Sequence, residues 1–187
     1  MKSIAIFASG KGSNAQAIIE HFKAHSAIKV VLVVSNNPDA GVIHIAHRNK
    51  IISAIISKDF FGNEERMEQL LKSFNLDLIV LAGFLHLIPS FLLKKFPNRI
   101  VNIHPAILPK HGGKGMYGKK VHEAVLNSKD AETGITIHYV NEKYDEGEVI
   151  LQKKISVEST DTVETLSQKV QELEHKWFPK AIEQLLK

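Results

Sequence analysis

Asn102 and His104 have side chains suited to catalysis, and they lie two residues apart in Val101-Asn102-Ile103-His104-Pro105. Side chains two apart on a strand project to the same side, and Pro105 ends the expected strand directly after the pair. An amide donor beside an imidazole can stabilise the oxyanion of a tetrahedral intermediate. The pair therefore predicts the reactive centre of a transferase, against the alternative of a purely structural histidine.

A carboxylate is needed to tune such an imidazole, and Asp145 is the best candidate. Asp145 lies in Tyr144-Asp145-Glu146-Gly147, a loop expected between two strands, from where it can reach back to His104 and favour its protonated form. His138 lies on the more polar side of the strand before this loop. A solvated loop acid is the alternative interpretation of Asp145.

Histidine and aspartate are also metal ligands, so a metal site has to be considered. His21 and His25 are four residues apart, but they lack the glutamate of a His-Glu-x-x-His motif and fall at a helix end. The chain contains no cysteine, which excludes thiolate nucleophiles, disulfides and cysteine-ligated metals. We therefore expect no metal site.

A second polar segment, Ser9-Gly10-Lys11-Gly12-Ser13-Asn14, follows the first expected strand and opens a helix. Backbone N–H groups and the helix dipole can together hold a phosphate at such a place. A tight turn without a ligand is the alternative. The candidate phosphate-binding residues are Lys11, Gly12, Ser13 and Asn14.

Two nucleotide-binding motifs come close to this loop. Gly10, Gly12 and Ala15 satisfy a loose Gly-x-Gly-x-x-Gly/Ala fingerprint, but the second strand ends in Ser35-Asn36-Asn37-Pro38, where a ribose-binding acid is expected. A P-loop is also disfavoured, because no Gly-Lys-Ser/Thr follows a spacer of four. The loop therefore indicates phosphate binding without a dinucleotide.

Alternating strand-like and helix-like runs must position these residues. The alternation predicts one α/β domain over residues 1–187, an open, mostly parallel twisted sheet with helices on both faces, of Rossmann-like type. The uninterrupted apolar run at residues 30–34 is typical of a strand covered on both faces. We expect strands at residues 4–8, 29–35, 53–57, 78–82, 99–103, 133–140 and 149–157, and helices at 15–23, 42–49, 64–74 and 119–127.

Two further segments complete the expected organisation. A last helix starts with Asp161 and Glu164 at the spacing of a capping box, and Pro179 should kink or stop it. A Gly-rich loop is expected at residues 109–118; its part at residues 111–118 has enough glycine to be mobile as a lid, from which Lys114 can reach an anion.

Composition is that of a soluble globular protein, with 44% hydrophobic and 24% charged residues. The net charge of +4 is small, and aromatic residues do not alternate with the basic ones, so we expect no nucleic-acid partner. The first apolar run is too short for a signal peptide or a membrane span. A cytoplasmic protein without membrane association is expected.

Taken in order along the chain, these motifs resemble those of the phosphoribosylglycinamide formyltransferases, folate-dependent enzymes that formylate glycinamide ribonucleotide in purine synthesis. The resemblance covers nearly the whole length. It is carried by the loop at residues 9–14, Leu81-Ala82-Gly83-Phe84, Asn102-Ile103-His104-Pro105 with Leu108-Pro109-Lys110, Thr133-Gly134-Ile135-Thr136-Ile137-His138, and Asp145-x-Gly147-x-Val149-Ile150.

The resemblance implies that 10-formyltetrahydrofolate donates its formyl group directly to the primary amine of glycinamide ribonucleotide, without metal or ATP. Asn102 and His104 would bind the oxyanion, Asp145 would sustain the imidazolium and move protons through water, and His138 would support them. The expected partners are these two small molecules, and the expected state is a monomer or homodimer.

Binding residues follow from the same resemblance. Glu174 matches a residue that contacts the sugar or phosphate end of the substrate, and near Asn63, where better-known members carry a phosphate-binding arginine, Arg66 is a candidate replacement. The expected folate-binding residues are Phe84, Leu85, His86, Leu87, Ile88, Asn102, Tyr144 and Asp145.

Other functions use the same residues. Methionyl-tRNA formyltransferase and formyltetrahydrofolate hydrolase share the Asn-x-His-Pro signature, but they carry additional domains for which 187 residues leave no room. A hydrolase, or a formyltransferase with another acceptor, remains the enzymatic alternative. A nucleotide-binding or regulatory module without turnover is the non-catalytic one.

Overall fold

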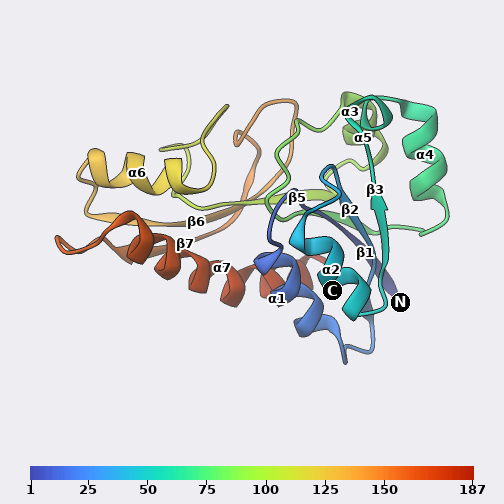
Figure 1. The fold of residues 1–187 in the computed structure, drawn as a ribbon, viewed down its shortest axis with the longest axis horizontal. Coiled ribbons are helices and arrows are strands. Elements are labelled where there is room, and N and C mark those ends of the chain that lie inside the picture. Colours follow the sequence, from blue (N-terminus) through green and yellow to red (C-terminus); the bar gives the residue numbers. More distant parts are fainter.

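The parallel sheet predicted from the alternating pattern is present, and it extends to seven strands in the computed structural model, which describes all 187 residues (Figure 1). The order is β3-β2-β1-β4-β5-β6-β7, in which the first five are parallel and β6 and β7 are antiparallel. The strands are β1 (Lys2–Phe7), β2 (Ile28–Ser35), β3 (Ile52–Ile55), β4 (Leu78–Leu81), β5 (Ile100–His104), β6 (Glu132–Tyr139) and β7 (Val149–Ser156).

Helices cover both faces of the sheet, as expected. Figure 1 shows the long α7 packed along one face, with α4 on the opposite side. The helices are α1 (Ser13–Phe22), α2 (Gly41–Arg48), α3 (Lys58–Phe61), α4 (Glu64–Lys72), α5 (Ser90–Lys95), α6 (Lys119–Asn127) and α7 (Val163–Leu185).

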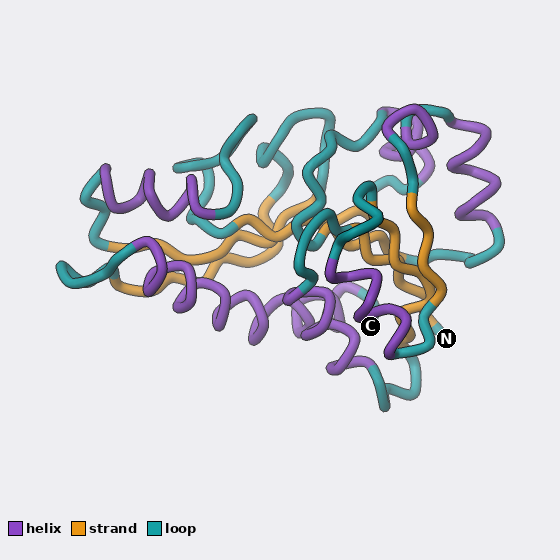
Figure 2. The backbone as a smooth tube through the Cα atoms, in the orientation of Figure 1, coloured by secondary structure: helices purple, strands orange, loops and turns teal.

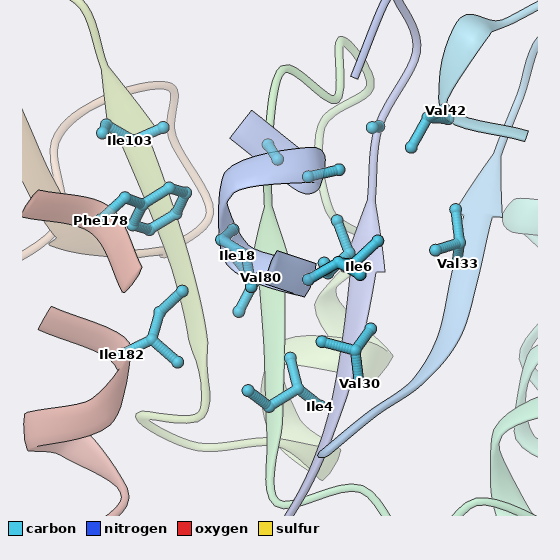
Figure 3. Packing of buried hydrophobic residues seen from close by; sticks show 14 of the residues in the cluster. Ile4, Ile6, Ile18, Val30, Val33, Val42, Val80, Ile103, Phe178 and Ile182 are labelled. Atoms are coloured by element: carbon cyan, nitrogen blue, oxygen red, sulfur yellow. The ribbon is translucent and has the colours of Figure 1, made fainter. Parts of the chain in front are cut away.

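The period of two in β1 divides the core into two layers. Ile4 and Ile6 belong to the cluster under α1, α2 and α7, whereas Phe7 belongs to the cluster under α3, α4 and α5. In the first cluster Ile18 of α1 and Phe178 of α7 are fully buried against the sheet (Figure 3). Burial of apolar side chains on both faces stabilises the sheet, and their close packing fixes the positions of the strand ends.

The carboxyl ends of β1 and β4 meet in the middle of the sheet, where the strand order reverses. The N–H of Ser9 donates to the carbonyl of Gly83 at 3.0 Å and ties the two loops together. Open α/β sheets bind ligands at such a switch point. Figure 2 shows loops gathered along the upper edge of the sheet.

Several local expectations need correction. The N-cap of α7 is Thr162, whose capping box uses Thr165, so Asp161 and Glu164 do not form it. Pro179 is buried inside α7 and does not end it, because the helix continues to Leu185. The short helices α3 and α5 lack an apolar repeat long enough to be predicted.

None of the helices combines the length with the apolarity needed to cross a membrane.

Candidate active site

The end of β5 opens into a cavity of about 610 Å³. Asn102 and His104 both border it, which confirms that they project to the same side of the strand. The antiparallel pairing of β5 with β6 sets Asn102 opposite His138 and His104 opposite Thr136. The site is therefore built on two paired strands, whose ladder fixes the side-chain positions.

Asp145 reaches back to His104 as the sequence predicted. Its Oδ2 lies 3.4 Å from Nδ1 of His104 and accepts a hydrogen bond of 2.9 Å from the N–H of Gly113. The backbone of Asp145 is left-handed, with φ of 57°. That turn directs the carboxylate into the cavity.

Asn102 lies between His138 and Asp145. Its Nδ2 donates to Nε2 of His138 at 3.1 Å and to Oδ1 of Asp145 at the longer distance of 3.4 Å. Nδ1 of His138 donates to the carbonyl of Tyr139 at 2.8 Å, so the geometry favours the neutral ring with its proton on Nδ1. His138 is 2% exposed, because the side of β6 predicted to be polar faces the protein interior.

Burial and charge act in opposite directions on His104. Burial lowers its pKa, whereas Asp145 and the carbonyl of His111 raise it, and burial outweighs both. Asp145 therefore favours the protonated form of His104, in the direction that the sequence predicted, but burial is the larger effect in the ligand-free site.

Asp145 itself is held ionised. Burial alone would raise its pKa, but the neighbouring His138, His104 and the N–H of Gly113 outweigh burial and lower it. Nε2 of His138 lies 3.7 Å from Oδ1 of Asp145, which is too long for a direct hydrogen bond. The site combines a buried carboxylate with a neutral imidazole.

The β1–α1 loop lies at the other end of the cavity. Gly12 is the N-cap of α1, with φ of 83°, and no side chain caps this helix. The first N–H bonded to a backbone carbonyl in this turn is that of Gln16, to the carbonyl of Gly12, which leaves the N–H groups of residues 13–15 for an anion. Of the four predicted phosphate-binding residues only Asn14 borders the cavity; Lys11, Gly12 and Ser13 do not.

Helix α7 covers this loop. Nδ2 of Asn14 donates to Oε2 of Glu174 at 2.9 Å, and Nε2 of Gln171 donates to Oγ of Ser13 at 3.0 Å. Burial raises the pKa of Glu174 to about 7, although Asn14 opposes the shift. One N–H of Asn14 is thus used within the protein, while its second N–H and the Ser13 hydroxyl remain as donors beside the backbone N–H groups.

A third part of the cavity wall is apolar. The segment 84–88 borders it: Phe84 and Ile88 are buried, whereas Leu85 and Leu87 are 50% and 42% exposed. Nδ2 of Asn36 lies 3.0 Å from Nε2 of His86. The expected folate residues, Tyr144 included, thus all border this one cavity.

Some predicted residues lie elsewhere. Asn63 caps α4 by accepting from the N–H of Arg66, and neither residue borders the cavity. His21 pairs with Glu183 at 2.9 Å, and Nδ1 of His25 accepts from backbone N–H groups. The side chains of Asn63, His21 and His25 therefore make structural contacts outside the cavity.

His122 of α6 borders the cavity and was not predicted from the sequence. It is 4% exposed, and its Nδ1 has no hydrogen-bond partner. Burial and the nearby His104 lower its pKa. In the sequence His122 lies beside Val121 and Val125, which are buried in α6, and this pattern predicts only ordinary helix packing.

Comparison with known proteins gives consistent matches over the whole chain. The formyl transferase family model matches residues 2–182. "Phosphoribosylglycinamide formyltransferase, chloroplastic" from Arabidopsis thaliana is 42% identical over 97% of this chain, which spans 64% of that protein. Its namesake from Bacillus subtilis (strain 168) is 38% identical, with 100% of this chain and 95% of the relative covered.

Solved structures agree with the sequence matches. The crystal structure of phosphoribosylglycinamide formyltransferase from Bacillus Halodurans superimposes with a TM-score of 0.88 at 37% identity, covering 99% of this chain and 95% of that one.

Proposed function

The chain belongs to the formyl transferase family, within the phosphoribosylglycinamide formyltransferases, and from this premise we propose that it transfers formyl from 10-formyltetrahydrofolate to glycinamide ribonucleotide. The observation that carries the proposal is one cavity bordered both by the Asn102/His104/Asp145 centre and by Asn14 at the start of α1. A formyl donor and a phosphorylated acceptor can therefore meet in it.

In the proposed reaction the primary amine attacks the formyl carbon and forms a tetrahedral intermediate. The bond from that carbon to the folate nitrogen then breaks, the amine loses a proton, and the folate nitrogen gains one. Asn102 Nδ2 donates to the oxyanion, and the positive charge of a protonated His104 ring stabilises it. The 3.4 Å contact of Asn102 with Asp145 is the weaker of its two, so a substrate oxygen can replace it.

Asp145 supplies the proton acceptor. Its pKa is lowered, so it is ionised at neutral pH and can accept, through water, the proton that the amine loses. As negative charge develops on the substrate oxygen, it favours the protonated form of His104 that burial disfavours in the free site. The imidazolium, protonated from solvent water, is thus present when the charge that it stabilises develops, and it returns the proton to water when the intermediate breaks down.

The acceptor phosphate is assigned to the start of α1. The uncapped N–H groups after Gly12 and the positive end of the helix dipole suit a dianion. Glu174 and Oδ1 of Asn14, which is buried without a partner, are acceptors that suit the sugar hydroxyls. Lys11 adds positive charge from outside the cavity.

The folate is assigned to the apolar wall. Leu85, Leu87 and Tyr144 expose apolar surface beside the reactive centre, as expected for residues that pack against a flat heterocycle.

An absorbance assay of folate product formation tests the proposal. With both substrates present the product should accumulate, and it should do so far more slowly when glycinamide ribonucleotide is omitted. Equal rates with and without the acceptor would favour a hydrolase, and no product under either condition would refute the transfer reaction.

A further inference from the structure

The His104 ring is held from a side opposite to Asp145 by the loop that precedes α6. Its Nε2 lies 2.8 Å from the carbonyl oxygen of His111. A carbonyl oxygen only accepts, so this contact fixes a proton on Nε2 and leaves Nδ1 facing Asp145. The orientation and the tautomer of His104 thus depend on where the His111 backbone lies.

The His111 side chain is anchored in turn. Its Nε2 lies 2.7 Å from Oδ2 of Asp130, with both side chains largely buried at 13% and 16% exposure. Nζ of Lys110 contacts the other carboxylate oxygen at 2.9 Å from an exposed position. Asp130 follows α6, whereas His111 precedes it, so the contact closes the segment that carries the helix.

This anchor is local and specific. His111 adopts a left-handed backbone with φ of 56°, which a flexible loop would hold only if contacts stabilised it. The two residues that follow are glycines, and the second of them, Gly113, donates to Asp145. The contact between the His111 and Asp130 side chains therefore restrains this loop next to two of its backbone groups. These are the His111 carbonyl, which contacts His104, and the Gly113 N–H, which donates to Asp145.

We propose that Asp130 and His111 form a positioning pair that orients His104 through the His111 carbonyl and holds the following loop over Asp145. The inference rests on the proposed function, because it takes His104 as the oxyanion-binding imidazole. Neither residue of the pair is required to touch substrate.

The electrostatic effect of the pair has a defined sign. The His111 carbonyl and Asp145 raise the pKa of His104 against burial, while the nearby His138 and the imidazole of His111 lower it. His122 is the remaining titratable neighbour, on α6. Withdrawal of the His111 carbonyl removes an acceptor of the Nε2 proton, so the pKa of His104 should fall further.

The test measures both His104 and turnover in the full-length protein. In Asp130→Ala, nitrogen NMR of the ligand-free protein should show the titration midpoint of the His104 ring lowered by about half a pH unit or more. Turnover should fall about tenfold, with a smaller change in KM, because the imidazole is displaced from its productive position.

Two variants control for unspecific damage. Lys110→Met removes the exposed partner of Asp130 but leaves His111 bound, so the His104 midpoint and turnover should stay near those of the unmodified protein. Asp130→Asn keeps one acceptor oxygen for His111, so its His104 midpoint and its turnover should lie close to those of the unmodified protein. If Asp130→Ala does not fold, His111→Asn breaks the same contact with a side chain that tolerates a left-handed backbone.

The outcomes separate the two proposals. A lowered midpoint in Asp130→Ala supports the positioning pair even if the unmodified protein transfers no formyl group, which would refute only the proposed function. An unchanged midpoint overturns the positioning pair, whether or not turnover falls.

Discussion

The two ends of the cavity are built on different principles. At the β5 end the site consists of side chains: Asn102 and His104 each lie 3.4 Å from Asp145, and His104 and Asp145 shift each other's pKa. At the α1 end, the backbone N–H groups of residues 13–15 have no partner within the chain, while Nδ2 of Asn14 donates to Glu174. The reactive end should therefore depend on side-chain identity, and the phosphate end on backbone conformation.

The largest effect is expected at the reactive end. His104→Ala should lower turnover by about 10²–10³-fold, the cost of losing one oxyanion donor in other enzymes. The melting temperature should stay close to that of the unmodified protein, and the single-turnover rate should fall by the same factor as turnover. Turnover within a few-fold of the unmodified protein would remove His104 from the mechanism.

A backbone change should be the most harmful at the phosphate end. In Gly12→Ala a Cβ would lie 2.8 Å from Cβ of Val42 at a φ of 83°, so we expect a loss of about 1–3 kcal/mol in unfolding free energy. KM for glycinamide ribonucleotide should rise about tenfold as the N–H groups shift.

Gly10→Ala is the matched control for this change. A Cβ on Gly10 would meet nothing within 4 Å, so denaturant unfolding should detect little change. Equal destabilisation by both substitutions would contradict the steric account of Gly12.

Glu174 should give this end a pH-dependent stability. Its folded pKa of about 7 lies above the ordinary glutamate value of 4.5, so the folded state binds the proton more tightly. The resulting stability is fully present below about pH 4.5 and is lost as pH rises through 7. Since Glu174 is partly exposed, we expect a loss of about 1–2 kcal/mol.

Glu174→Gln removes this titration. Urea unfolding at pH 5 and pH 8 should therefore show a smaller decline in the variant than in the unmodified protein. Identical declines would indicate that Glu174 is ionised in the folded state at both pH values.

The smallest effect is expected for the exposed cation of the loop. Lys11→Ala should raise KM for glycinamide ribonucleotide by less than about twofold at physiological salt, because a solvent-screened charge outside the cavity contributes little. Steady-state kinetics at low and high salt would measure it. A tenfold rise would mean that the phosphate is bound by this side chain as well as by the backbone.

Local patterns predicted the elements better than their ends. The apolar runs of β1, β2 and β4 and the apolar stripe of α1 were sufficient to predict these elements, because strand and helix periodicity are properties of short segments. The cap of α7 was misplaced by one residue, since Asp161, Thr162 and Glu164 all suit a helix start. The structure uses Thr162, with Thr165 as its hydrogen-bond partner.

The sequence by itself determined that Asn102 and His104 share one side of a strand, and that a Gly-rich turn opens a helix. Both follow from the repeat of the backbone and from residue type. Only the tertiary structure decided that burial lowers the pKa of His104, and that Asn14 pairs with Glu174 from 160 residues away. It likewise decided that the His111 carbonyl meets the His104 ring. These features depend on desolvation and on contacts between distant segments, which arise only when the chain packs.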